Sequence, residues 1–575
     1  MKAPKSFAIT FLIGALALLL PSPVAASWYK WTASGGGNWA SAANWTVVNG
    51  PAGAGYPNLP DDLAEFGESA VDRTITINQS ISITQLIIDD DSDVFFFGNS
   101  NGRLVFDTTA THPTRSTAVD VHGIGQHNIS IPIVIADPIA IRVYDTGRLA
   151  CSGGIQQTVG APTLYKDGTG TLLFASLFNN SYHGLTHVRE GVLELQHLNA
   201  TALAGPLMVG TGASQTPTAF VRLRGDNQID DDRQITVVSD GVFELGSHTE
   251  RVDIVNVVDG KITIGDLPTH HAAFMPSNLI LNGGTMQIAR DSVLDLSSNV
   301  TATSSPAKRA LISGEGTVRL NTNTRTFMIS DGPDAVDLEV QAALVGAGGA
   351  GIEKNLPGTM RFTTATVNNY AGLTSVVAGR LELARTGGGV SIPGNLRITQ
   401  AGMPSVAAVL AHHNISDTSH VAVFPGAEFR VDAVEMIERL DLQPEALVQI
   451  GAAAAAQLSA RYLTMIGSRV NILPLGLLRV GNAVGATSSG GGITSTITGD
   501  GTLELASIEG APTIFEVADG PQPIDLLIST RVAGPSVVEV RTIMSGTLRI
   551  DGSGDFAGRF YHALGLLLIL SLIHI

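Results

Sequence analysis

One segment of this chain occurs twice in an unbroken register. Residues 166–195 return as residues 354–383, so that every matched position lies 188 residues from its partner. The matched residues are Lys166, Gly170, Thr171, Tyr182, Gly184, Thr186 and Gly191 in the first copy, and Lys354, Gly358, Thr359, Tyr370, Gly372, Thr374 and Gly379 in the second. An internal repeat sets the architecture before any local pattern is considered. It also favours function on long surfaces over function in a single pocket.

A shorter signature, glycine followed by alternating apolar residues, recurs along most of the chain. The alternation is that of a strand with one face buried, and glycine suits the corner before it. The steps are 23 from Gly147 to Gly170, 21 from Gly170 to Gly191, 24 from Gly260 to Gly284 and 25 from Gly476 to Gly501. Steps of about 20–25 residues are typical of the coils of a parallel β-solenoid, whereas a β-sandwich turns every 8–12 residues. The sequence predicts an all-β fold, a parallel β-helix. The step of 32 from Gly284 to Gly316 does not fit the pattern.

The offset of 188 divides the chain into larger units. The Gly-Thr pair of residues 170–171 and 358–359 returns at 546–547. Residues 314–320 return as 499–505 at an offset of 185, and residues 302–305 return as 486–489 at 184. Residues 250–254 resemble 438–442 at 188, so we predict strand and loop there rather than helix. The predicted division is a signal peptide at 1–26, a cap with the first strands at 27–100, the solenoid start at 101–165, repeat units at 166–353 and 354–541, the start of a third unit at 542–569, and a tail at 570–575.

The N-terminus has the pattern of a secretory signal peptide. Lys2 and Lys5 precede an apolar run at 7–20, and small residues follow at 24–26. We predict cleavage after Ala26 and export of the mature chain.

The tail 570–575 resembles the translation of an adaptor used in sequencing libraries. Because a third unit has barely begun before it, we expect the natural chain to continue. A short genuine hydrophobic end is the alternative.

The four tryptophans lie close together near the N-terminus, at Trp28, Trp31, Trp39 and Trp45. Flat indole rings could form a sugar-binding platform. They could also cover the open apolar end of a solenoid, which terminal repeats must do. We favour the cap, because large rings bury much area with few residues.

The segment 168–195 resembles the autotransporter-associated β-strand repeat, also called the passenger-associated transport repeat. The resemblance rests on a Gly-Thr-Leu strand, then Asn180-x-Tyr182-x-Gly184-x-Thr186, then Gly191-x-Leu-x-Leu, and 358–383 matches equally. It implies a right-handed β-helix passenger of a diderm bacterium, secreted or displayed at the cell surface. The implied partners are outer-membrane export machinery or a translocator, together with extracellular glycans or cell-surface components. No translocator barrel is recognisable in the sequence.

Composition narrows the chemistry. The net charge of −17 disfavours nucleic acid, because no basic surface is present to release counterions. Cys151 is the only cysteine, which excludes an intrachain disulfide and a cysteine-based zinc site. We predict no metal site and no cofactor.

Few residues are candidates for catalysis. The acidic runs 89–93 and 230–233 could supply paired carboxylates or bind Ca²⁺, but a solvated turn is the favoured interpretation. Adjacent residues on a strand point to opposite faces, so neither His270–His271 nor His412–His413 should chelate one metal. The glycine-rich run 346–351 lacks the Lys-Ser/Thr of a phosphate loop. Lys166 and Lys354 occur once per unit, which indicates structure rather than catalysis. We therefore predict a structural or adhesive passenger that is not an enzyme. The alternative is a polysaccharide lyase or glycoside hydrolase, which three or more acidic side chains converging beside a basic residue would favour.

Overall fold

The computed structural model describes most of the chain after the predicted signal segment. The described residues are 26–91, 93–98, 101–109, 117–266, 271–451, 455–506, 513–534, 539–543, 545–554, 559–562 and 565–569. The predicted signal peptide up to residue 25, His270 and the tail 570–575 lie outside these residues.

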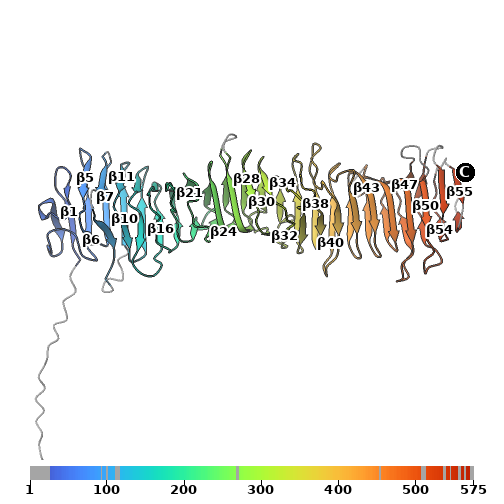
Figure 1. Cartoon of the computed structure of the whole chain (residues 1–575), viewed down its shortest axis with the longest axis horizontal. Helices are drawn as coiled ribbons and strands as arrows, with labels where there is room; N and C mark the ends of the chain where they lie inside the picture. Colours follow the sequence, from blue (N-terminus) through green and yellow to red (C-terminus); the bar gives the residue numbers. More distant parts are fainter. Residues whose placement is uncertain are drawn as a thin grey trace, which may run out of the picture.

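The chain winds into one long rod of stacked strands, which Figure 1 shows from its N-terminal to its C-terminal end. Most strands belong to two long sheets, and a third, four-stranded sheet of β6 (Ser80–Ile83), β9 (Arg103–Phe106), β12 (Ile133–Ile135) and β15 (Ile155–Gln157) lies near the N-terminus. Each strand pairs in parallel with its counterpart in the next coil, as β13 (Ile139–Val143) does with β16 (Leu164–Asp167). The predicted parallel β-solenoid is confirmed.

The coils vary more in length than the sequence predicts. Paired positions lie 19 residues apart between Val421 and Leu440, but 33 apart between Ile87 and Asp120. The irregular step from Gly284 to Gly316 has a simple origin. Gly284 precedes β27 (Thr285–Ile288) of the second sheet, whereas Gly316 precedes β31 (Thr317–Arg319) of the first, so the two glycines begin strands on different faces.

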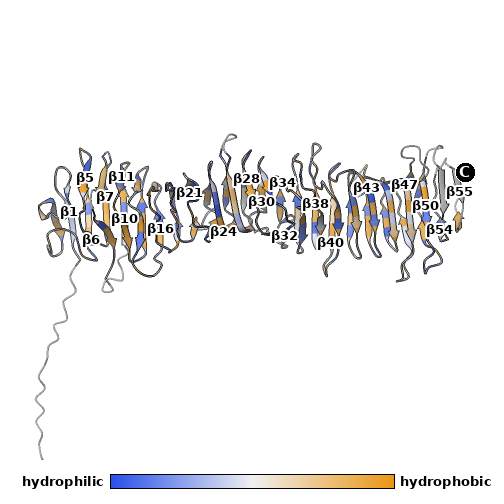
Figure 2. Ribbon diagram, viewed as in Figure 1, coloured by the Kyte–Doolittle hydropathy of each residue, from blue (hydrophilic) through white to orange (hydrophobic). Residues whose placement is uncertain are grey.

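Alternate side chains of each strand point into the rod and form one continuous core. In β16, Leu164 and Lys166 are buried and their neighbours are partly exposed. Figure 2 shows the resulting alternation of hydrophobic and hydrophilic colour along the strands. Because consecutive strands are about 4.8 Å apart, each inward side chain stacks on those of the coils before and after it. A row of outward side chains therefore runs along the rod.

The tryptophan-rich segment caps the N-terminal end. Here β1 (Trp28–Trp31) pairs antiparallel with β3 (Trp45–Asn49), whereas the pairings between the other described strands are parallel. The indoles of Trp31, Trp39 and Trp45 are buried, and those of Trp31 and Trp45 lie 5.1 Å apart in an edge-to-face arrangement. A sugar platform needs exposed ring faces, so these three rings act as a cap. Trp28 is 38% exposed, and its indole N–H donates to Glu65 at 2.8 Å.

One expected correspondence between the two units is wrong. The segments 250–254 and 438–442 are strands, as predicted, in β24 (Thr249–Val258) and β43 (Val434–Leu442). However, the buried Glu250 corresponds to Glu435, at an offset of 185. Each carboxylate accepts hydrogen bonds from backbone N–H groups of the preceding coil, at 2.8 Å from Gln228 and from Asn414. Residues 438–442, which resemble 250–254 at an offset of 188, lie three positions further along their strand, because the loops of the two units differ in length.

Candidate functional site

The conserved lysine of the repeat lies inside the rod. The Nζ of Lys166 donates to the carbonyl oxygens of Asp167, Gly168 and Glu190 at 2.8, 2.6 and 3.0 Å. The Nζ of Lys354 does the same with Asn355, Leu356 and Ala378 at 3.2, 2.5 and 2.9 Å. Burial lowers the pKa of Lys166 to about 8 and that of Lys354 to about 7. Each ammonium fastens one corner of its coil to the next coil.

The remaining polar residues of the motif also face inward. The hydroxyl of Tyr182 lies 2.6 Å from that of Thr186, and the pair Tyr370–Thr374 repeats this contact at 2.7 Å. Burial raises the pKa of both phenols, which therefore stay protonated. Asn180 links the coils before and after it. Its side chain accepts a hydrogen bond from the Ile155 N–H and donates one to the Ala202 carbonyl, each at 2.7 Å.

The motif glycines occupy places where a side chain does not fit. Gly191 and Gly379 have φ of 73° and 70°, in the left-handed region, and an added Cβ would lie 2.8 and 2.5 Å from the lysine Nζ atoms. At Gly184 an added Cβ would lie 1.8 Å from the Pro162 carbonyl oxygen, and at Gly372 it would lie 2.3 Å from that of Ala350. These glycines allow neighbouring coils to approach.

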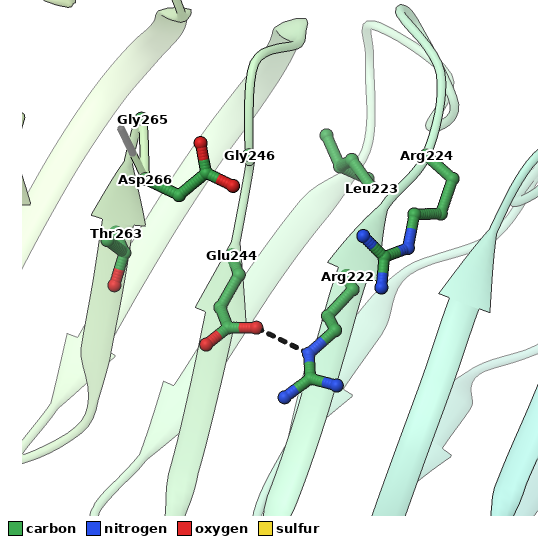
Figure 3. A pocket seen from close by; sticks show the side chains of 8 residues that line it. All are labelled: Arg222, Leu223, Arg224, Glu244, Gly246, Thr263, Gly265 and Asp266. Atoms are coloured by element: carbon green, nitrogen blue, oxygen red, sulfur yellow. Dashed lines mark hydrogen bonds and ion pairs between the residues drawn. The ribbon is translucent and has the colours of Figure 1, made fainter. Parts of the chain in front are cut away.

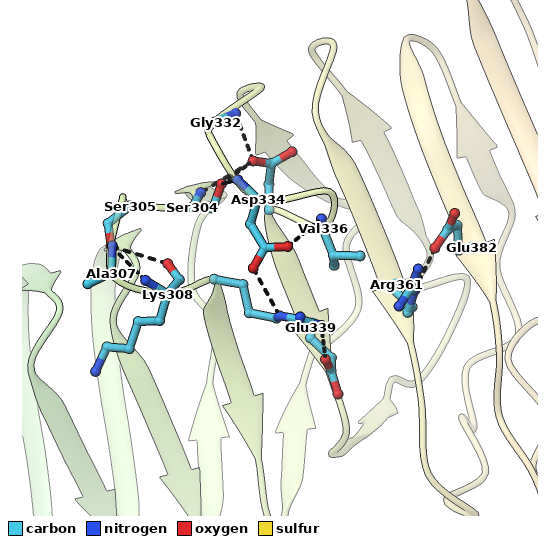
Figure 4. A network of polar contacts seen from close by, with 12 residues as sticks. Ser304, Ser305, Ala307, Lys308, Gly332, Asp334, Val336, Glu339, Arg361 and Glu382 are labelled. Atoms are coloured by element: carbon cyan, nitrogen blue, oxygen red, sulfur yellow. Dashed lines mark hydrogen bonds and ion pairs between the residues drawn. The ribbon is translucent and has the colours of Figure 1, made fainter.

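A further repeated contact involves residues that the sequence analysis did not single out. The carboxylate of Asp337 accepts from the Ser304 hydroxyl at 2.7 Å, and from the backbone N–H groups of Gly332 and Thr359 at 2.8 Å each. Asp525 repeats these contacts with Ser488, Gly520 and Thr547. Figure 4 shows Ser304 and Gly332 at this corner of the rod, with the Arg361–Glu382 ion pair of 2.5 Å apart from them at the right. The return of residues 302–305 at 486–489 was the available signal.

Residues shared by both units thus hold the coils together, and a candidate site is formed by residues that the units do not share. A hollow of about 500 Å³ opens where five successive strands of the first sheet end. The strands are β13, β16, β18 (Thr186–Val188), β20 (Leu207–Val209) and β22 (Gln234–Val238). We call it the Tyr144 groove, which is lined by Arg142, Tyr144, Asp167, Gly168, Arg189, Glu190, Thr211, Ala213, Ser214, Thr218 and Asp240. Its volume is in the range of ligand pockets.

Aromatic rings form one end of the Tyr144 groove. The ring of Tyr144 stacks on that of His122, with centroids 4.6 Å apart and planes 10° from parallel. Gly168 of the next coil lies close to the Tyr144 ring, because a Cβ added there would lie 3.3 Å from it. Burial, and then the charge of Asp120, raise the pKa of Tyr144, so that its hydroxyl remains a donor. An aromatic face with a polar edge is a suitable wall for a sugar ring.

Ion pairs form the floor of the groove. Arg189 donates to both oxygens of Asp167, at 2.7 and 2.5 Å, and its guanidinium lies 4.3 Å from the centre of the Tyr165 ring. Arg142 donates to Asp120 at 3.0 Å and lies 4.0 Å from Asp167. These bidentate and stacked contacts hold the side chains in fixed positions before any ligand arrives.

The far end of the groove is acidic. Asp240 accepts from the hydroxyl of Thr211 at 2.6 Å and from the N–H groups of Thr211 and Gly212 at 2.7 Å each. Partial burial alone would raise the pKa of Asp240, but these hydrogen bonds lower it overall, so the carboxylate stays ionised. Glu190 is exposed between the two ends.

The second unit has the same framework without this surface. Gly170 donates its N–H to the Val143 carbonyl, and Gly358 donates to that of Ile329, which makes Ser330 the counterpart of Tyr144. The lysine contacts match Glu190 to Ala378. The replacements are Arg142 by Met328, Tyr144 by Ser330, Asp167 by Asn355, Arg189 by Val377 and Glu190 by Ala378. Arg142 and Tyr144 precede the first unit and their counterparts lie at its end, so the Tyr144 groove forms where the first unit begins and not where the second begins.

No family model, curated protein or solved structure matches this chain. The fold and the arrangement of side chains are thus the basis of any functional argument. In the described part of the chain, no helix has the length and apolar character needed to cross a membrane. The same residues contain no group of three or more His, Cys, Asp or Glu side chains that could hold a metal ion.

A second hollow, of about 210 Å³, lies on the other long sheet and is shown in Figure 3. Arg222 pairs with Glu244 at 2.6 Å, and Arg224, at the same edge, pairs with Glu194 at 2.7 Å. It lacks an aromatic wall and is smaller than the usual ligand pocket. We interpret these residues as ion pairs that link neighbouring strands on the outer face of this sheet.

The acidic and histidine candidates lie in turns. Asp90 is buried and accepts from the Asp93 N–H at 2.9 Å, as a turn residue does. Asp230–Arg233 forms a turn closed by a backbone hydrogen bond of 3.0 Å. In the turn that contains His412, the Nδ1 atom of this histidine accepts a hydrogen bond from the Val434 N–H at 2.9 Å, so a structural contact occupies this nitrogen.

One carboxyl pair escaped the sequence analysis. Burial, and then the neighbouring charge of Asp137, raise the pKa of Asp107. Asp137 accepts from the N–H and the hydroxyl of Thr108, at 2.8 Å each. The two aspartates are 30 residues apart, and only the stacking of coils brings them together.

Proposed function

We propose that this protein is an exported β-solenoid with an adhesive or structural role, which binds extracellular glycans at the Tyr144 groove. Its rod would present outward side chains to glycans, matrix or neighbouring cells at the surface of a diderm bacterium. The signal-like N-terminus and the resemblance of the repeat to the autotransporter-associated β-strand repeat support export and the passenger role.

The contrast between the two units carries the proposal. Tyr182, Asn180, Lys166 and the glycines have counterparts in the second unit, where they make the same buried contacts between coils. Tyr144, Arg189 and Glu190 have no such counterparts, although the backbone around them is the same. Packing alone therefore does not require them, and an aromatic wall above fixed polar groups is suited to sugar hydroxyls and pyranose faces.

Isothermal titration calorimetry of the purified protein with neutral and acidic polysaccharides tests this function. A triple variant, Tyr144→Ser, Arg189→Val and Glu190→Ala, introduces the residues that stand at the corresponding positions 330, 377 and 378. We expect it to lose at least about fivefold in affinity, because one aromatic contact contributes roughly 1 kcal/mol.

The matched control is Tyr462→Ser, which removes a tyrosine that is 36% exposed elsewhere on the rod. It should bind like the unchanged protein, and both variants should keep their thermal unfolding midpoint. Equal binding by the triple variant and the unchanged protein, or no binding to any glycan, would contradict the proposal.

The Asp107–Asp137 pair favours a second candidate, a polysaccharide lyase or glycoside hydrolase. A carboxyl with a raised pKa beside a second carboxyl is the arrangement that such enzymes use for acid and base. Incubating the protein with the same polysaccharides and measuring new reducing or unsaturated ends tests it. Turnover that Asp107→Asn abolishes would establish the enzyme and displace the adhesive role. Its absence with every polysaccharide would leave the adhesive role.

A further inference from the structure

The ion pairs within the Tyr144 groove indicate which class of ligand it can bind. The guanidinium of Arg189 is bound bidentately by Asp167, and that of Arg142 is shared between Asp120 and Asp167. A carboxylate or sulfate on a ligand would have to displace these carboxylates. Such a replacement exchanges one carboxylate for another and leaves an aspartate without its partner, so an anionic ligand gains little net interaction energy at these partly exposed arginines.

The remaining charge in the groove is negative. Asp240 and the exposed Glu190 have no arginine among the ion pairs of the described residues, and Asp240 is satisfied by uncharged donors. The chain as a whole carries −17. The electrostatic field of the whole chain and the negative charge within the groove therefore both oppose an anionic ligand. Carboxylate oxygens, in contrast, readily accept hydrogen bonds from the hydroxyl groups of a neutral ligand.

The shape of the groove points to an extended ligand. Its lining comes from the ends of β13, β16, β18, β20 and β22, which are neighbours in that order. Four steps between neighbouring strands of about 4.8 Å span roughly 19 Å along the rod. Tyr144 lies at the first strand and Asp240 after the last, so a single sugar ring cannot contact both ends.

We propose that the Tyr144 groove binds a neutral, hydroxyl-rich glycan chain that lies along the axis of the rod, with one sugar stacked on Tyr144 and later sugars bonded to Glu190 and the Thr211–Asp240 end. This inference rests on the proposed glycan-binding function and gives its ligand class and direction.

A ladder of oligosaccharides tests both parts of the inference. Calorimetry would use neutral gluco-, galacto- and manno-oligosaccharides of one to six sugars, and oligogalacturonates of the same lengths. We expect at least one neutral series to gain tenfold or more in affinity between one sugar and the length that fills the groove, and then to reach a plateau. Each oligogalacturonate should bind at least tenfold more weakly.

Two variants locate the chain in the groove. Tyr144→Ser should weaken every length of the neutral series, whereas Glu190→Ala should weaken only oligomers long enough to pass Tyr144; Tyr462→Ser should weaken none. Stronger binding of oligogalacturonates that still depends on Tyr144 would overturn the neutral class and leave glycan binding intact. Affinity independent of length would overturn the axial direction. No binding of any oligosaccharide would reject both the inference and the proposed function.

Discussion

The two repeat units differ far more on their outside than on their inside. Lys166 and Lys354 each hold three backbone carbonyls, and Asn180 and Asn368 bridge equivalent coils. On the outer surface, Tyr144 of the first groove region corresponds to Ser330. Inward positions must satisfy buried polar groups and fill a core of fixed width, so few side chains fit. Outward positions are free of that demand, so the units can carry different surfaces on the same framework.

The largest expected effect concerns the buried asparagines. Asn368 differs from Asn180 because its Oδ1 also accepts from the Arg385 guanidinium, at 2.8 Å. We expect Asn180→Ala to lower the free energy of unfolding by about 3 kcal/mol, since it leaves a buried N–H and a buried carbonyl unpaired. Asn368→Ala should cost more, because a buried charge loses a partner as well. Urea denaturation measures both, with the outward Asn471→Ala as control. Equal losses in the two units would contradict this difference.

A smaller effect is expected where the units place different residues in one strained conformation. Gly168 and its counterpart Leu356 have φ of 72° and 66°. A side chain at 168 would meet the Val143 carbonyl at 2.5 Å and the Tyr144 ring at 3.3 Å. Gly168→Leu should therefore destabilise the rod by about 2 kcal/mol. Leu356→Gly, in which strain relief offsets lost burial, should change stability by less than about 1 kcal/mol. Thermal unfolding of the two variants compares them, and a tolerated Gly168→Leu would show that the first unit has the same room.

The buried lysines should separate the units by pH. The pKa of Lys354 is about 7 and that of Lys166 about 8, both below the unfolded value of about 10.4. Between the folded and unfolded values the unfolded chain binds more protons, so this contribution to stability rises with pH. The stability gap between the unchanged protein and Lys354→Met should widen by about 1 kcal/mol from pH 7 to 8. The gap for Lys166→Met should begin to widen about one pH unit later.

Comparison with the Lys→Met variants is needed because other groups act in the opposite sense. Burial raises the pKa of Glu250 and Glu435 to about 8, so their contribution to stability falls as pH rises from about 4.3 to 8. Denaturation curves at several pH values, taken as differences from each variant, isolate the lysines. Gaps that do not change with pH would mean that the ammonium groups keep their protons in the fold.

The smallest expected effect on stability is the most informative about function. Ser330→Tyr, Asn355→Asp and Val377→Arg together would transfer the groove wall and its ion pair to the second unit. Because these positions face outward, we expect stability to change by less than about 0.5 kcal/mol. Calorimetry with the neutral oligosaccharide bound by the first unit should then detect a second, weaker site. A stable graft that adds no binding would show that residues it leaves out, among them Gly168, Glu190 and Asp240, are needed for the site.

The sequence by itself determined the architecture of this protein. Alternating apolar residues after glycines, at steps near 23, predict inward and outward faces locally, and the offset of 188 predicts that whole coils repeat. Such patterns are readable because the strand period and the left-handed glycines are properties of neighbouring residues. They also predicted that Lys166 and Lys354 are structural and that all four tryptophans form a cap; both lysines and three of the four indoles are buried, whereas Trp28 is 38% exposed.

Only the tertiary structure decided which residues meet. Tyr144, Asp167, Glu190 and Asp240 lie more than twenty residues apart along the chain, and no local pattern connects them. Loops of different length shift the register between units, which is why Glu250 matches Glu435 rather than the similar letters three residues later. Stacking at about 4.8 Å per coil converts such distant residues into one surface. The groove is therefore a product of register, which local sequence does not specify.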